Sequence, residues 1–224
     1  MDIELHYLEQ GEGEPLILLH GNGEDATYFV HQMSAFARTH RVIAVDTRGY
    51  GGSPRGAAPF TLEQFARDLA AFMDGLGIQG AHLLGFSDGA NIALLFALAY
   101  PGRVRSLVLN GGNLFPEGLL PAVRQQDLAD LEKAQQVGDI RAEERLRLMT
   151  DAPHIDPASL ASISVPTLVV AGTDDMILPE HTRLIAQSIP GAQLAFLEGT
   201  HFVAMENPAA FNACVGKFLA GVMS

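Results

Sequence analysis

The most constraining feature of this chain is a series of short runs rich in Val, Ile and Leu, separated by amphipathic stretches. The runs are continuously apolar, which is typical of parallel strands buried on both faces. They lie at 15–19, 41–46, 81–85, 104–110, 165–172 and 192–197. Helical patterns fall near 25–38, 61–75, 88–100, 179–188 and 207–222. This alternation of strands and helices predicts an α/β fold with a doubly wound, mostly parallel sheet.

Two segments depart from that alternation. Residues 2–9, DIELHYLE, alternate apolar and polar side chains, which predicts an edge strand at the start. Residues 114–159 contain no strand-like run and carry two charged helical patterns. Because this segment follows a strand end, where ligands bind in open α/β sheets, we interpret it as a short helical lid instead of an ordinary surface excursion. The predicted organisation is a core of 1–113 and 160–224 with a lid at 114–159.

Composition excludes several classes of protein. The chain has 224 residues, 48% of them hydrophobic, which suits one domain with a sizeable core. A formal net charge of −12 argues against nucleic acid and anionic membrane surfaces as partners. A single cysteine, Cys214, allows neither an internal disulfide nor a thiolate metal cluster, and we predict that it packs in a helix face. No histidine pair has zinc-binding helical spacing, so we expect no metal.

Localisation follows from what the chain lacks. No apolar run reaches the length of a transmembrane helix, and the first residues carry acids where a secretory leader carries basic residues before an apolar run. We therefore expect a cytoplasmic protein that has no membrane partner.

The pentapeptide at 85–89 is Gly-Phe-Ser-Asp-Gly, and it lies between a predicted strand and a predicted helix. The pattern Gly-x-Ser-x-Gly in that context indicates a serine held on a sharp turn as a nucleophile. Ser87 is therefore a candidate nucleophile. Asp88 beside it is unexpected, because a carboxylate next to a developing oxyanion is unfavourable.

A glycine-rich loop near the start supports a competing hypothesis. Gly21-Asn22-Gly23 and Ala26 follow a strand, and Asp46 ends the next strand, which matches the spacing of a dinucleotide fingerprint. A nicotinamide-dependent oxidoreductase is therefore an alternative. It is disfavoured because Glu24 and Asp25 would lie where a pyrophosphate should bind and would repel it. We expect no cofactor and prefer a loop whose backbone N–H helps to form an oxyanion hole.

A serine nucleophile needs a general base, and that base needs an orienting acceptor. Asp174 and Asp175 come just after the strand at 165–172, and His201 comes just after the last strand. The chain order Ser, Asp, His is the one expected of a nucleophile turn in a doubly wound sheet.

The segments LLHGNG, DTRGYGGS, GFSDG, AGTDDMILP and EGTHFVAMENP, each at a strand end, together resemble the α/β-hydrolase family over nearly the whole chain. The resemblance implies Ser87 as nucleophile, His201 as general base, and the backbone N–H groups of Asn22 and Asp88 as oxyanion donors. By the family's spacing the acid is Asp175, with Asp174 as the fallback. It also places the lid after the family's sixth strand. Against the family, this chain is expected to start at the second strand and to have a short lid, and both departures suggest a compact member with a shallow, fairly open pocket.

The reaction implied by the resemblance is acyl transfer to water on a small-molecule substrate, because a serine at this turn excludes the branches that use a carboxylate nucleophile. A small carboxylic ester, thioester or lactone is our first choice. The alternatives are an aminoacyl-ester hydrolase or aminopeptidase-like enzyme, a carbon–carbon hydrolase, a cofactor-free perhydrolase and a non-catalytic ligand-binding member.

Asp88 has two possible roles. At the first position of a helix its carboxylate would meet unsatisfied backbone N–H groups and the positive end of the helix dipole, a structural role. Alternatively it would bind an ammonium on the acyl part of a substrate, as in similar hydrolases that act on amino-acid esters.

Overall fold

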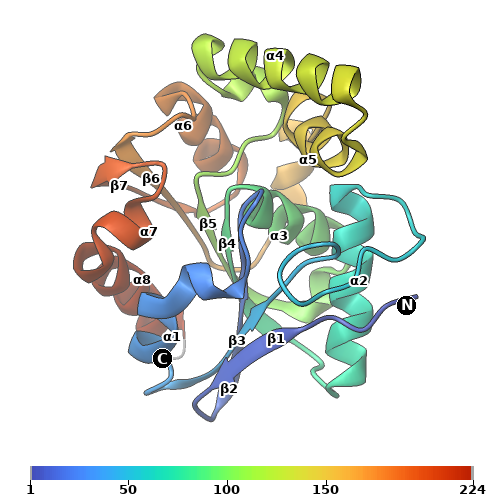
Figure 1. Cartoon of the computed structure of the whole chain (residues 1–224). Helices are drawn as coiled ribbons and strands as arrows, with labels where there is room; N and C mark the ends of the chain where they lie inside the picture. Colours follow the sequence, from blue (N-terminus) through green and yellow to red (C-terminus); the bar gives the residue numbers. More distant parts are fainter. Residues whose placement is uncertain (1, 223–224) are drawn as a thin grey trace.

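The computed structural model describes residues 2–222 and shows a seven-stranded sheet flanked by helices (Figure 1). The strand order is β1-β3-β2-β4-β5-β6-β7, and all neighbouring strands run parallel except β1 and β3. The bounds are β1 (Tyr7–Gln10), β2 (Glu14–Leu19), β3 (His40–Val45), β4 (Ala81–Phe86), β5 (Val104–Asn110), β6 (Thr167–Asp174) and β7 (Gln193–Thr200). The prediction of a doubly wound, mostly parallel sheet is confirmed.

Helices cover both faces of this sheet (Figure 1). They are α1 (Val30–Phe36), α2 (Leu62–Gly75), α3 (Asp88–Ala99), α4 (Pro121–Val137), α5 (Ile140–Thr150), α6 (Pro179–Ser188), α7 (Val203–Glu206) and α8 (Pro208–Val222), with 3₁₀ turns η1 (Ala26–Phe29), η2 (Pro101–Arg103), η3 (Pro116–Gly118) and η4 (Pro157–Ser162). None of the helices within residues 2–222 combines the length and the apolar character that crossing a membrane requires.

The apolar strand residues divide between two cores. Ile17 and Leu83 face α2 and α3, whereas Leu18 and Leu84 face α1 and α8. Successive side chains of a strand point to opposite faces, so a strand covered on both faces must be apolar throughout. The continuous apolar runs in the sequence have this cause.

The two edge strands differ from the predictions. The first strand begins at Tyr7 instead of Asp2, because residues 2–6 bond to the 46–58 loop, with His6 N–H donating to Ser53 Oγ at 2.8 Å and Asp46 N–H to the His6 carbonyl at 3.0 Å. The last strand, β7, was expected to be buried but is half-exposed along its length. It lies at the opposite edge of the sheet, where no further strand covers it.

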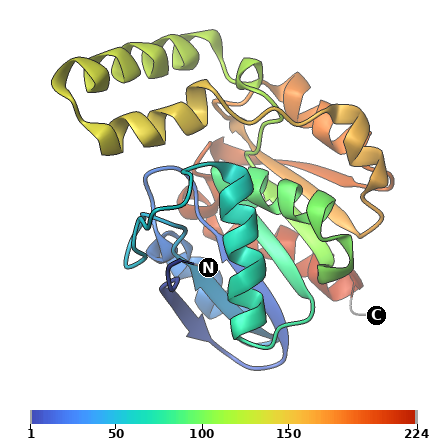
Figure 2. The same cartoon turned by 90° about the vertical axis from the view of Figure 1, so that its right-hand side faces the viewer.

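In chain order, helices α4 and α5 come between β5 and β6, the fifth and sixth strands of this chain. They project as a pair beyond the carboxyl ends of the strands (Figure 2). The start of the segment is fixed to the core by Leu114 N–H, which donates to His181 Nε2 at 2.8 Å. Leu148 of α5 is buried in the core. The segment at 114–159 is thus helical, as predicted.

Candidate active site

Ser87 occupies the sharp turn between β4 and α3. Its φ of 53° and ψ of −119° make it the one non-glycine residue with positive φ among residues 2–222. Such a backbone costs about 1–3 kcal/mol and persists only where the surroundings impose it. Here they do: a Cβ on Gly85 would lie 2.2 Å from the Gly89 carbonyl oxygen, and one on Gly89 would lie 1.9 Å from that of Leu19. The two glycines let strand, helix and turn approach closely enough to present the serine.

His201 and Asp175 form a buried pair. His201 Nδ1 lies 2.6 Å from Asp175 Oδ1, and the two side chains are 5% and 2% exposed. Asp175 also accepts from the backbone N–H of Ile177 at 3.0 Å, which fixes its carboxylate. Because Nδ1 donates to the carboxylate, Nε2 is left as the acceptor of the ring. Asp174 is exposed and turned to Thr173, so Asp175 holds the histidine.

Two neighbours bring His201 to the turn that carries Ser87. The ring of Phe86, the residue before the serine, has its centroid 4.8 Å from that of His201. Gly111, the residue after β5, has φ of 63°, and a Cβ there would lie 2.8 Å from His201 Cε1. Within residues 2–222, Ser87 Oγ and His201 share no hydrogen bond; in ligand-free enzymes such bonds are often long and tighten with substrate.

The loop after β2 carries the first candidate oxyanion donor. Thr47 N–H donates to His20 Nε2 at 3.0 Å, so His20 Nδ1 carries the proton and donates to the Gly21 carbonyl at 2.8 Å. Burial lowers the pKa of His20, which favours this neutral form. The backbone N–H groups of Asn22 and Asp88 meet no acceptor within the described chain. Both donors remain available for a substrate oxygen.

The Asp88 side chain matches only part of the predicted structural role. Its carboxyl group is buried and accepts from the Asn22 side-chain Nδ2 at 3.0 Å, and it takes no backbone N–H of its own helix within the described residues. Burial raises the pKa of Asp88 to about 7, and the Asn22 bond opposes that rise. The expected bonds to helix N–H groups are therefore not seen, whereas Asp88 does lie in the first turn of α3, at the positive end of the helix dipole.

Asp46 does not fit the dinucleotide hypothesis. Its carboxylate accepts from the backbone N–H of Ala26 at 2.6 Å and of Gly52 at 2.7 Å, and contacts His6 Nδ1 at 2.7 Å. A carboxylate with three partners inside the protein is not directed at a ribose hydroxyl. It ties three loops together instead.

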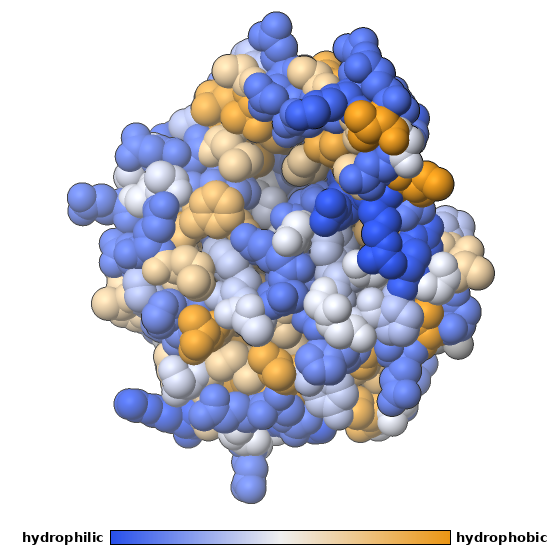
Figure 3. Space-filling view, viewed as in Figure 1, coloured by the Kyte–Doolittle hydropathy of each residue, from blue (hydrophilic) through white to orange (hydrophobic). Residues whose placement is uncertain are grey.

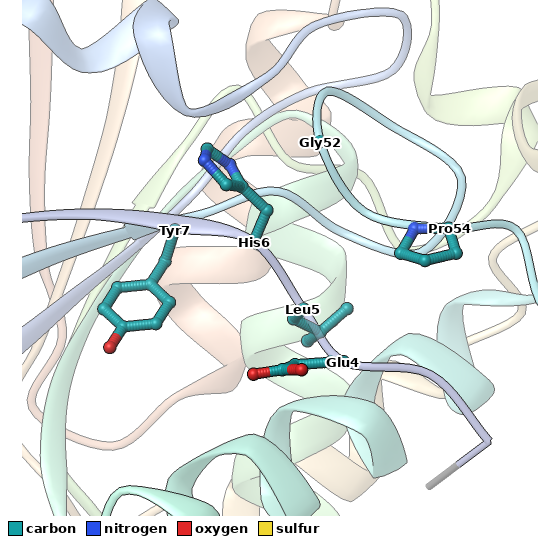
Figure 4. Close-up of a pocket in the computed structure, with 6 residues that line it drawn as sticks. All are labelled: Glu4, Leu5, His6, Tyr7, Gly52 and Pro54. Atoms are coloured by element: carbon teal, nitrogen blue, oxygen red, sulfur yellow. The ribbon is translucent and has the colours of Figure 1, made fainter.

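Two surface features complete the description. Figure 3 shows a face of the molecule on which α4 and α5 lie above the core. A hollow separates this helical pair from the core, and hydrophilic residues gather in it beside α5. An open groove of about 400 Å³ lies between the first residues and the 46–54 loop. It is lined by Glu4, Leu5, His6, Tyr7, Gly52 and Pro54 (Figure 4). This groove includes none of the candidate site residues. Within residues 2–222, no three His, Cys, Asp or Glu side chains gather in a metal-binding cluster.

Sequence reasoning missed three contributors to this site: the side chains of Asn22 and His20, and the glycine at position 111. The sequence carried a signal for the last one, because two consecutive glycines, Gly111 and Gly112, follow the strand at 104–110. The absence of a side chain there is what admits the His201 ring.

Comparison with known proteins agrees with this geometry. Residues 14–140 match the family model of the alpha/beta hydrolase fold. The chain belongs to the α/β-hydrolase fold family. A 2-hydroxy-6-oxononadienedioate/2-hydroxy-6-oxononatrienedioate hydrolase of Burkholderia vietnamiensis is 34% identical over 97% of this chain and 91% of its own. RutD of Azorhizobium caulinodans, provisionally named a carbamate hydrolase, is 31% identical over 94% and 93%.

Solved α/β-hydrolase structures are also similar. The enol-lactonase from Burkholderia xenovorans LB400 superposes with a TM-score of 0.82 at 28% identity, covering 97% of each chain. A thermophilic esterase from Thermogutta terrifontis gives 0.83 at 26% identity, covering 99% of this chain and 95% of its own. The fold and the names of these relatives together support hydrolase activity, and those names span several kinds of bond.

Proposed function

We propose that this protein is a serine hydrolase that cleaves a small carboxylic ester, thioester or lactone through an acyl-enzyme on Ser87. One observation carries the proposal: a strained, half-buried serine lies on the turn between β4 and α3, and the residue before it, Phe86, packs against the buried His201–Asp175 pair. A structure rarely maintains a non-glycine residue in this backbone region without a functional reason.

The mechanism follows from the atoms available. Ser87 Oγ attacks the carbonyl carbon while His201 Nε2 takes its proton, and the Asp175 carboxylate stabilises the imidazolium that forms. The N–H groups of Asn22 and Asp88 donate to the oxyanion of the tetrahedral intermediate. The imidazolium then protonates the departing alcohol, which leaves the acyl-enzyme. Water, deprotonated by His201, attacks the acyl carbon and releases the acid and Ser87. No cofactor takes part.

Carbon–carbon and carbamate bonds are second candidates. They are favoured by the names of the curated relatives, which include a hydrolase of oxononadienedioates and a provisionally named carbamate hydrolase. The first steps on Ser87 would be shared, so the leaving group distinguishes them. A panel of p-nitrophenyl acetate, a γ-lactone, an aryl carbamate and a vinylogous 1,5-diketone should show the highest kcat/KM for the ester or lactone. A preference of tenfold or more for the diketone or the carbamate would replace the ester assignment.

The direct test combines labelling with substitution. A fluorophosphonate should label the wild-type protein at Ser87, and Ser87→Ala or His201→Ala should reduce p-nitrophenyl acetate turnover by at least about 10³-fold. Asp175→Asn should be nearly as damaging, whereas Asp174→Asn, its neighbour, serves as the matched control and should stay within about threefold of wild type. Retention of most activity in Ser87→Ala would refute the proposal. A reversed order for the two aspartates would move the acid back by one residue.

We further propose that 114–159 acts as a lid over this site. Its position beyond the carboxyl ends of β4 and β5 supports this role (Figure 2). Replacing 121–150 with a short glycine-serine loop should change the ratio of kcat/KM for hexanoate and acetate esters, while acetate is still hydrolysed. An equal loss on both esters would rule out a lid that selects the acyl chain.

A further inference from the structure

The side chain of Asn22 links three parts of the proposed active site. Its Nδ2 donates to Asp88 Oδ2 at 3.0 Å and to the backbone carbonyl of Arg145 at 2.9 Å. An amide nitrogen carries two hydrogens, so both bonds form at once. Asp88 follows Ser87 directly, and Arg145 lies in α5, 123 positions from Asn22. One side chain therefore connects the loop after β2, the nucleophile turn and the helical insertion.

The position of α5 depends on an adjacent ion pair. Arg55 Nε and Nη2 donate to the two carboxylate oxygens of Glu144 at 2.9 and 2.5 Å, and both side chains are about one-quarter exposed. Arg55 is itself held, with its guanidinium 4.9 Å from the Phe60 ring centroid. A two-point contact of this kind fixes orientation as well as distance. Because Glu144 precedes Arg145, the pair fixes the carbonyl that Asn22 contacts.

The residues linked in this way also carry the oxyanion donors. Asn22 and Asp88 each contribute a backbone N–H that has no acceptor within the described chain. The Asn22–Asp88 side-chain bond joins the two residues that carry these N–H groups. Asn22 is the one hydrogen-bond partner of the buried Asp88 carboxyl within residues 2–222.

We propose that the Asn22 side chain is a positioning residue that transmits the docking of α5 to the oxyanion hole. When Arg55 and Glu144 hold α5 in place, Asn22 is held between the Arg145 carbonyl and Asp88, and both N–H groups converge on the substrate oxygen. When α5 is displaced, Asn22 loses one of its two acceptors. This inference rests on the proposed serine-hydrolase function and adds a route by which the insertion affects the chemical step itself.

The test is a double-mutant cycle on p-nitrophenyl acetate, whose acyl group is too short to need contacts with the insertion. Asn22→Ala keeps the backbone N–H and removes both side-chain bonds, and Glu144→Gln loosens α5 without touching Asn22. Glu143→Gln is the matched control, because Glu143 pairs with Arg147 on the same helix and not with the 46–60 loop. Asn22→Ser serves as a second variant of the first site, and thermal unfolding checks that each variant is folded.

Asn22→Ala should lower kcat by about 10- to 100-fold with KM within about twofold, because the hole acts on the transition state. Inhibition by a trifluoromethyl ketone, which mimics the tetrahedral intermediate, should weaken by the same factor. Glu144→Gln should lower kcat by about three- to tenfold in the wild-type background and have no further effect in Asn22→Ala. Glu143→Gln should leave kcat unchanged.

Two results would overturn the inference while leaving the proposed function standing. One is a labelled, active protein in which Asn22→Ala and Asn22→Ser keep kcat within twofold of wild type. The other is an equal effect of Glu144→Gln in both backgrounds, which would show that α5 acts by another route. A wild-type protein that neither reacts with fluorophosphonate nor hydrolyses any ester would overturn the proposed function, and this inference with it.

Discussion

Gly111→Ala tests how tightly the candidate site is packed around His201. Gly111 directly follows β5 with φ of 63°, and an added Cβ would lie 2.8 Å from His201 Cε1, 2.9 Å from Nδ1 and 3.6 Å from Asp175 Oδ2. Carbon atoms in ordinary contact lie about 3.5–4.0 Å apart, so the ring must move by roughly 0.7 Å. The Asp175 oxygen already lies at contact distance and does not need to move. The substitution thus displaces the base relative to its own acid.

Two separate effects are expected. An L-residue in the left-handed region costs roughly 1–2 kcal/mol relative to glycine. In a protein of this size that corresponds to a fall in Tm of roughly 2–8 °C. A displacement approaching 1 Å at a catalytic group can cost about 10²-fold in rate, so we expect kcat for p-nitrophenyl acetate to fall by roughly 10- to 100-fold.

Gly191→Ala separates these effects. Gly191 lies in the turn before β7 with φ of 73°, and an added Cβ there meets no atom within 4 Å. It carries the same backbone strain without a clash near the site. Scanning calorimetry should show a loss of Tm for both variants, larger for Gly111→Ala because of the added clash, and steady-state kinetics should show a loss of kcat for Gly111→Ala alone. Equal kcat in the two variants would refute the packing of His201 against Gly111.

Further predictions concern Asp88, Ser87 and Arg48. Burial raises the pKa of Asp88 from 3.8 to about 7, so the folded state binds a proton that the unfolded state has released, and its stability falls as the pH rises between those values. Asp88→Asn should therefore raise Tm at pH 8 by more than at pH 4, and an equal shift at both would contradict a raised pKa. If Asp88 binds an ammonium, the same variant should lower kcat/KM for an aminoacyl ester more than for its deaminated counterpart; equal losses would end that hypothesis. Ser87→Gly should abolish turnover and stabilise the fold by roughly 1 kcal/mol by relieving the φ of 53°, whereas Ser87→Ala should abolish turnover without that gain. Arg48→Met should lower the free energy of unfolding by roughly 3–5 kcal/mol, measured by chemical denaturation, because it removes the guanidinium 2.7 Å from the buried Asp68 carboxylate. Arg41→Met, at the half-exposed pair with Glu9, should lower it by less than about 1 kcal/mol. Similar losses in the two variants would contradict a penalty for leaving the buried Asp68 carboxylate unpaired.

The secondary-structure elements and the nucleophile turn depend on short stretches of sequence, so they could be predicted from the sequence. The continuous apolar runs specify strands covered on both faces, and the order of those runs with helices between them specifies a parallel sheet. Ser87 was identifiable because the glycines at 85 and 89 are required by a close approach of backbones that no other residue allows. The choice of Asp175 followed from the spacing of other family members, and its catalytic role stays a prediction. The structure adds that Asp175 is buried against His201 while Asp174 is exposed.

Only the tertiary structure determined the contacts between segments that are distant in the sequence. The partner of Asp88 is the Asn22 side chain, 66 positions away, and no local pattern contains that distance. The half-exposed last strand is likewise a consequence of its place at the edge of the sheet, because its run at 194–197 is as apolar as a central strand. The requirement for glycine at position 111 also depends on a distant residue, because His201, 90 positions later in the chain, packs against it. Periodicity and turn chemistry act over a few residues, so they fix the elements and the nucleophile turn, whereas the environment of each side chain is set by the packing of those elements against one another.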